Sequence, residues 1–326
     1  MDPVFDCVGD PRAMGHAQGL VCKDAIRAAL AERGIATRRS RIPTLRALTR
    51  GHRLGRGAGR ELVRHYTHLA ERMAGIARNA DVPFESLMDL FSRATTPPDP
   101  SDILFAPAVA IASARTGGAA PILLRTLCGG PFSQSHWWLR RSRPEVGFAS
   151  IEVTLPWLAT AVAGINEAGV SLALVPRSES YGSGVLAGAV NARHAPHAVL
   201  LVQECLQRFE DVEGCVDWCS KRPRAGNVSL VIVDAQGRLA RAEVEGTGCR
   251  ISDFDEAVAF DGAPEPLSGA LAGHLARDAS LSGEAATAVA DALGEHSVWL
   301  EPAARKLSLR SLRGPGGDEK AVEISL

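Results

Sequence analysis

Apolar residues recur at helical spacing in the first hundred positions. One such series is Leu62, Tyr66, Leu69, Met73 and Ile76. Steps of three and four residues place these side chains on one face of a helix, so the pattern predicts a helix over residues 59–80. Asp10 and Pro11 offer an N-cap and a first helical proline for an earlier helix, and a shorter helix is expected over 84–91. No strand is expected before residue 100.

The pattern changes after a turn-rich stretch at residues 95–102. Short runs of β-branched and small apolar residues predict strands at 107–114, 121–127, 147–154, 158–164 and 169–175. Further along, the periods predict a helix over 195–220, a hairpin of 227–234 with 238–245, a helix over 283–294 and a strand pair near 296–312. Helices followed by neighbouring strands indicate an α+β protein.

Composition excludes several classes of protein. The chain has 326 residues, of which 46% are apolar and 22% charged, as in ordinary soluble globular proteins. Its net charge of -1 argues against chain-wide attraction to nucleic acid or to an anionic membrane. No apolar run is long enough to span a bilayer, and the first residues lack the layout of a signal peptide. We therefore expect a cytoplasmic protein.

Known cofactor and metal motifs do not occur in the sequence. There is no GxGxxG after a strand, no P-loop lysine motif and no HExxH. The seven cysteines have no paired CxxC spacing, so we interpret them as reduced thiols and expect neither a metal nor a cofactor.

Three segments occur in a recognisable order. They are residues 9–19 (Gly-Asp-Pro-Arg-Ala-Met-Gly-His-Ala-Gln-Gly), residues 153–170 with Gly-Ile-Asn-Glu-Ala-Gly-Val at their end, and residues 226–238 with Gly-Asn-Val-Ser-Leu at their start. Together they resemble the acyl-coenzyme A:6-aminopenicillanic acid acyltransferase family, also called the C45 peptidases. The resemblance implies a four-layer αββα sandwich of the N-terminal-nucleophile hydrolase type. Residues 1–102 would be the helical leader and 103–326 the core, in one integrated unit.

The resemblance also exposes a missing nucleophile. In relatives the precursor cuts itself before a cysteine, whose freed amine then acts as the base for its own thiol. That position aligns with Ala106, between Phe105 and Pro107, and alanine can neither attack a carbonyl nor drive self-cleavage. Because Thr126 and Cys128 depart from the family pattern as well, we favour natural divergence over an engineered substitution, and we expect an uncut chain.

Other site residues follow from the same alignment. Arg125 matches the family arginine that orients the nucleophile and the substrate, and Thr126 stands where the family has asparagine. Cys128 replaces the family acid and is either a relocated nucleophile or a small buried apolar residue. Asn227 matches the oxyanion donor of relatives, with a turn residue as the alternative.

Four further residues complete the candidate site. His136 is either a base or a structural histidine, and Trp137 next to it would contact the substrate. His194 and His197 flank Pro196, and they either line the mouth of a pocket or belong to the polar start of a helix.

The leading hypothesis is a diverged amidase or acyltransferase that acts on an amide or thioester carbonyl without the usual cysteine. Its partner would be a small-molecule acyl substrate, with acyl thioesters among the candidates, and neither nucleic acid nor a membrane; a homo-oligomer is left open. Two alternatives stand beside it: an inactive relative that binds an acyl ligand, and an engineered variant of an active amidase in which Ala106 replaces the cysteine.

Overall fold

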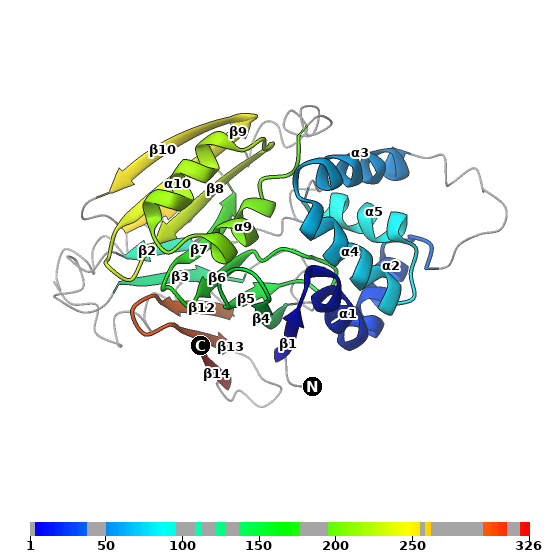
Figure 1. The fold of residues 1–326 in the computed structure, drawn as a ribbon, viewed down its shortest axis with the longest axis horizontal. Coiled ribbons are helices and arrows are strands. Elements are labelled where there is room, and N and C mark those ends of the chain that lie inside the picture. The colour runs from blue at the N-terminus through cyan, green and yellow to red at the C-terminus, as the bar shows by residue number, and fades with distance from the viewer. Residues whose placement is uncertain are drawn as a thin grey trace.

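Two stacked β-sheets form the centre of the protein (Figure 1). The computed structural model describes residues 4–37, 50–95, 108–111, 121–127, 137–176, 195–254, 258–261, 296–311 and 320–326. The helices within these ranges are α1 (Pro11–Val21), α2 (Lys23–Glu32), α3 (Arg50–His65), α4 (Thr67–Asn79), α5 (Phe84–Thr95), α9 (Leu200–Arg208) and α10 (Val212–Lys221).

The larger sheet has eight strands in the order β1-β4-β5-β6-β7-β8-β9-β10. These are β1 (Val4–Gly9), β4 (Trp138–Pro144), β5 (Ser150–Thr154), β6 (Ala163–Asn166), β7 (Ser171–Pro176), β8 (Gly226–Val233), β9 (Leu239–Gly246) and β10 (Gly248–Phe254). β1 pairs with β4 in parallel, whereas the other neighbours are antiparallel.

The smaller sheet has six antiparallel strands in the order β11-β2-β3-β12-β13-β14. These are β2 (Ala108–Ile111), β3 (Ile122–Thr126), β11 (Val258–Asp261), β12 (His296–Glu301), β13 (Lys306–Ser311) and β14 (Lys320–Ser325).

The described elements form three layers. β2 and β3 of the smaller sheet lie against β7 and β8 of the larger one, and α9 and α10 cover the opposite face of the larger sheet. Because both faces of β5, β6 and β7 are covered, nearly every residue of these strands is buried. The fourth layer of the expected αββα sandwich would need the helix predicted over 283–294, which lies outside the described residues.

The helices α1 to α5 gather at one side of the two sheets (Figure 1). α1 begins as its sequence predicts, because the Asp10 carboxylate accepts a hydrogen bond from the backbone N–H of Ala13 at 2.7 Å and Pro11 follows. α1 then packs closely along α4 through Gly15 and Gly75. None of the helices in the described ranges combines the length and apolar character that crossing a bilayer would require.

Three predictions made from local pattern were wrong. A strand does precede residue 100, because β1 pairs with β4, which lies more than 130 residues away in the sequence. The helix expected over 59–80 is two helices, since Tyr66 between α3 and α4 has an extended φ of -139°. The helix expected over 195–220 is also two, because Asp211 starts α10 anew by capping the N–H of Gly214.

The strand predictions were closer to the structure. The hairpin of β8 and β9 and the pair of β12 and β13 are confirmed, and β5 and β7 lie within their predicted ranges to a few residues. The strand expected at 158–164 instead begins at residue 163, because residues 155–162 form a buried turn. The sequence patterns did not predict β4, β10, β11 or β14.

A glycine at the α1–α4 contact gives a test of this packing. A Cβ at Gly75 would lie 2.5 Å from the carbonyl oxygen of Arg12. We expect Gly75→Ala to lower the free energy of unfolding by about 1–3 kcal/mol, as overpacking does. Gly57→Ala, in a helix position with nothing within 4 Å, should be neutral or stabilise the protein by less than about 1 kcal/mol. Urea unfolding followed by circular dichroism measures both, and equal effects would contradict the assigned contact.

Candidate functional site

Strand register defines one end of the smaller sheet. Ala108, the first residue of β2, lies opposite Arg125 near the end of β3, and Ser297 of β12 lies opposite Thr126. The chain therefore enters β2, two residues after position 106, at the end of the sheet where β3 finishes. Arg125 thus lies at the end of the fold where β2 begins.

The larger sheet contributes the start of β8 to this same end. Its registers at this end pair Trp138 with Thr154, Ala163 with Ala173, Pro176 with Val228, and Gly226 with Gly246. The two sheets are joined here because the indole N–H of Trp137 donates to the carbonyl of Leu127 at 3.1 Å. Asn227, the second residue of β8, therefore lies at the end of the sandwich that also holds Arg125.

Arg125 is fully buried between the sheets, and Trp137 lies beside it. The guanidinium carbon is 5.9 Å from the centre of the indole ring, within the range of a cation–π contact. A buried guanidinium is costly unless other groups stabilise it, and the indole ring of Trp137 is one such group.

Asn227 is half-buried and uses one side of its amide for the backbone. Its Oδ1 accepts a hydrogen bond from the N–H of Gly246 at 3.3 Å. The other functional group of this side chain is the NH₂ donor, which is the group that stabilisation of an oxyanion requires.

His197, one of the two histidines beside Pro196 that the sequence offered as lining of a pocket mouth, lies at this end, since it pairs with Ala225 just before β8. Its Nδ1 accepts from the N–H of Val199 at 3.1 Å, and the ring also interacts with the backbone of Thr95 at the end of α5. Burial lowers the pKa of His197 to about 4, so the imidazole is neutral near pH 7. Because His197 also pairs with Ala225, the residue before β8, it connects the end of α5 to the start of β8.

The remaining predicted residues cannot be placed in the same way. Ala106, Cys128, His136 and His194 lie outside the described residues, and for Thr126 only the backbone is described. Their roles stay predictions. Among the residues that the structure describes, no group of three or more His, Cys, Asp or Glu side chains is arranged to hold a metal ion.

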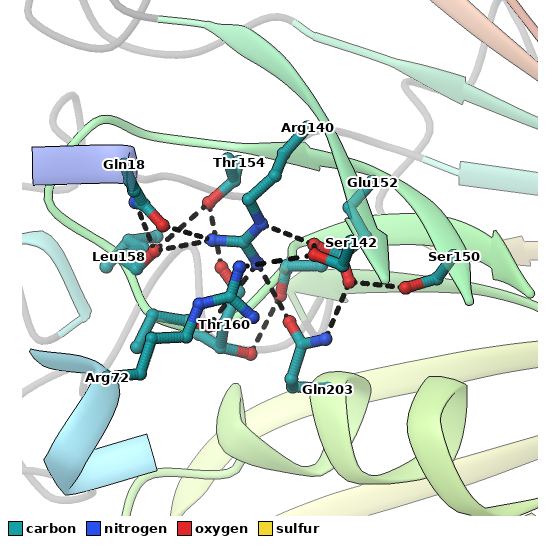
Figure 2. A network of polar contacts seen from close by, with 12 residues as sticks. Gln18, Arg72, Arg140, Ser142, Ser150, Glu152, Thr154, Leu158, Thr160 and Gln203 are labelled. Carbon is teal, nitrogen blue, oxygen red and sulfur yellow. Dashed lines mark hydrogen bonds and ion pairs between the residues drawn. The ribbon is translucent and has the colours of Figure 1, made fainter. Parts of the chain in front are cut away.

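A buried polar network lies beneath this end of the fold (Figure 2). Arg140 of β4 and Glu152 of β5 form an ion pair with an Nε–Oε2 distance of 2.5 Å, and both side chains are fully buried. Gln18 from α1 and Gln203 from α9 contact the pair directly, and Arg72 from α4 donates to Ser142, which in turn donates to Glu152 (Figure 2). The network therefore connects the N-terminal helices, the larger sheet and the helices that cover it.

Glu152 is the acceptor at the centre of the network. Besides Arg140, its oxygens accept from Ser150 and Gln203 at 2.6 Å and from Ser142 at 3.0 Å. Burial alone would raise the pKa of this carboxyl, but Arg140, Arg72 and these donors outweigh it and lower the pKa below its usual value. Glu152 is therefore an anion in the folded protein.

The network fixes the turn that follows β5. Arg140 donates to the carbonyls of Leu158 and Ala159, while Gln18 donates to those of Pro156 and Leu158 at 3.0 and 2.8 Å. Thr160 binds the carbonyl of Val199, next to His197, at 2.8 Å. These bonds satisfy the backbone of a turn that has no access to water, and so hold it at the end of the sandwich where Asn227 lies.

Comparison with known proteins gives distant similarities only. No protein-family model matches the sequence, and no curated protein matches it. The chain is similar to a solved structure of penicillin V acylase from Agrobacterium tumefaciens (14% identity, TM-score 0.42), covering 68% of this chain and 86% of that one. It is also similar to a Caenorhabditis elegans ortholog of N-acylethanolamine-hydrolyzing acid amidase (10%, 0.48), with coverages of 60% and 93%.

A third similar structure is a mutant of the conjugated bile acid hydrolase from Clostridium perfringens (10% identity, TM-score 0.43), with 67% of this chain and 92% of that chain covered. All of these TM-scores are below 0.5 and the identities are 14% or less. The similarities therefore assign neither an activity nor a substrate to this chain.

Removing the carboxylate of Glu152 tests the network. Glu152→Gln should lower the free energy of unfolding by about 3–5 kcal/mol, because it leaves Arg72 and Arg140 buried without an anion. Asp6→Asn is the matched control, since it removes the carboxylate of an exposed pair with Arg141 on the same sheet and should cost less than about 1 kcal/mol. Chemical unfolding of the two variants measures the difference, and a similar small loss in both would show that the buried pair contributes little.

The low pKa of His197 predicts acid sensitivity. The unfolded chain binds the proton with an ordinary pKa of 6.5 and the folded chain at about 4, so the stabilisation is complete above pH 6.5 and is lost as the pH falls toward 4. The free energy of unfolding should fall by up to about 1.4 kcal/mol per pH unit across this window. His197→Asn, which retains an acceptor for Val199, should flatten that slope, whereas His65→Asn should keep it. An unchanged slope in His197→Asn would refute the assignment.

Proposed function

We propose that this protein is a diverged amidase or acyltransferase that binds an amide or thioester carbonyl at the end of the sandwich defined by Arg125, Trp137 and Asn227. The observation that carries the proposal is the register of the two sheets. It brings Arg125, the start of β2 after position 106, and Asn227 to one end of the fold, although they are separated by up to about 120 residues in the sequence.

The proposed chemistry needs no residue at position 106. A nucleophile carried by the substrate, or a water molecule, attacks the carbonyl carbon, and the carbonyl oxygen becomes an oxyanion. The NH₂ group of Asn227 donates to that oxygen, and Arg125 positions the acyl group. Cys128 or His136 takes the proton of the nucleophile and returns it to the leaving group, which departs as a neutral amine or thiol. Holding the reactants in this geometry substitutes for a covalent intermediate.

An acyl-binding protein without turnover is the second candidate. His197, which lies at this end, uses its ring nitrogens in contacts with Val199 and Thr95 and is held neutral. An imidazole bound in this way supports the local structure and does not serve as a base. A protein that only binds an acyl ligand would need Arg125 and Trp137 but no base.

Intact mass spectrometry of the purified chain is the first experiment. We expect a single mass for residues 1–326, before and after incubation with a panel of acyl thioesters and activated amides, together with released thiol or amine. Two fragments divided between Phe105 and Ala106 would contradict the proposal. An acyl adduct lost in Cys128→Ala would identify Cys128 as a relocated nucleophile. Saturable binding without product would favour the second candidate.

Asn227→Ala tests the oxyanion donor. With a substrate found in that panel, kcat should fall by about 10²- to 10³-fold, since one donor to the oxyanion is removed. Gln236→Ala is the control, because it deletes an exposed amide in the turn at the far end of the same hairpin and should leave kcat unchanged. Equal rates in wild type and Asn227→Ala would remove Asn227 from the mechanism.

A further inference from the structure

A cavity of about 780 Å³ lies at the end of the larger sheet that is opposite to the candidate site. It is formed where β1 turns into α1, where β4 turns into β5 and where α9 ends, with α4 and α10 completing the wall. β4 ends here at Pro144, whereas the candidate site lies where β4 begins at Trp138. The two sites are therefore separated by the length of the strands.

Much of the wall of this cavity consists of apolar and aromatic side chains. Phe148, Phe209 and Trp218 line it together with Met14 and Leu69. The rings of Phe209 and Trp218 are 5.6 Å apart at their centres, so they form one continuous aromatic surface. A volume of this size is in the range of cavities that enclose small organic ligands.

Arg72 lines the same cavity and brings an uncompensated charge to it. Its side chain is 1% exposed, and its Nη2 donates to Ser142 at 3.2 Å. Arg140 uses Glu152, the carboxylate of the network, as its own partner, so two buried guanidiniums share one anion. Burial and the repulsion from Arg140 lower the pKa of Arg72 to about 10, which is partly offset by the thiol of Cys7 and by Glu152.

The unmatched polar atoms of the lining are hydrogen-bond donors. Within the described residues, Nε and Nη1 of Arg72 and the indole Nε1 of Trp218 are buried without an oxygen or nitrogen acceptor, and the further partner of the Arg72 guanidinium is the neutral thiol of Cys7, a weak acceptor. The nearby carboxylate of Glu204 is already held by His68 and by Arg208, whose Nε lies 2.9 Å from it. The acids Asp10 and Glu145 are exposed to water. Buried donors without acceptors, next to an excess positive charge, call for an anionic acceptor.

We propose that this cavity binds a small carboxylic acid with an aromatic or aliphatic body. The carboxylate accepts from Arg72 and Trp218, and the body packs against Phe148 and Phe209. Binding supplies the second anion that the pair of arginines lacks, so it stabilises the folded protein in proportion to its occupancy. This inference does not depend on the proposed function, because it uses none of the residues at the other end of the sheet.

Calorimetric titration of the full chain with phenylacetate, 4-phenylbutyrate and hexanoate tests the proposal, with 2-phenylacetamide as the neutral analogue. At least one acid should bind at a single site with a Kd below about 1 mM. The amide should bind at least about tenfold more weakly, because it cannot supply the charge. Absence of saturable binding by all three acids up to about 10 mM, or equal binding of acid and amide, would overturn the proposal.

Variants locate the bound acid. Arg72→Gln should weaken binding at least about tenfold, whereas Arg141→Gln, on β4 but outside the cavity, should leave the Kd unchanged. If Arg72→Gln does not fold, Phe148→Ala and Trp218→Phe replace it, and an unchanged Kd in both overturns the proposal. Binding that survives these changes but is lost in Asn227→Ala would place the acid at the candidate active end instead.

Discussion

The buried ion pair of Arg140 and Glu152 is the interaction on which the arrangement of the other elements depends. Two charges without access to water are tolerated only when nearly every donor and acceptor around them is satisfied. Here every nitrogen of the Arg140 guanidinium and both oxygens of Glu152 have partners, which are side chains from α1, α9 and two strands and carbonyls of the turn after β5 (Figure 2). If any one of these elements moved, a buried charge would lose a partner. The network therefore favours one relative placement of the N-terminal helices and the larger sheet over its alternatives.

The network also stabilises the backbone around the candidate site, although none of the candidate site residues belongs to the network. The turn at 155–160 is held from below by Arg140 and Gln18, and Thr160 connects it to the segment that carries His197. His197 in turn joins the end of α5 to the start of β8, where Asn227 lies. A pocket whose donor must stay within a few tenths of an ångström of a reacting oxygen needs supports of this kind.

The two ends of the larger sheet have different chemical characters. At one end, Arg125 is buried beside Trp137, and the half-buried amide of Asn227 lies at the start of β8 at the same end of the sandwich. At the other, Arg72 lines an aromatic cavity and carries the charge that the network leaves unbalanced. The network contacts both regions, through Arg72 on one side and the carbonyls of Leu158 and Ala159 on the other. The same buried polar groups thus stabilise the turn after β5 at one end and leave the charge of Arg72 without an anion of its own at the other.

The sequence by itself determined the features that short-range interactions control. The start of α1 follows from Asp10 and Pro11, and the hairpin of β8 and β9 follows from a turn in which Asp234 accepts from the N–H of Gln236 and of Arg238. In these cases donor and acceptor are at most four residues apart, so a local pattern contains the whole interaction. The ranges of several strands were predictable for the same reason, because burial of both faces leaves a short continuous apolar run in the sequence and burial of one face leaves an alternation.

Only the tertiary structure decided which of these helices, strands and side chains contact one another. The pairing of β1 with β4, the division of two predicted helices and the ion pair beneath the candidate site depend on partners that no local pattern contains; Arg140 and Gln18 are 122 positions apart. Arg125 and Asn227 were predicted as site residues by resemblance to a family, and their position at one end of the sandwich follows from strand register. Arg72 gave no signal in the sequence, because a charge becomes a binding group only when folding removes it from water and leaves it short of an anion.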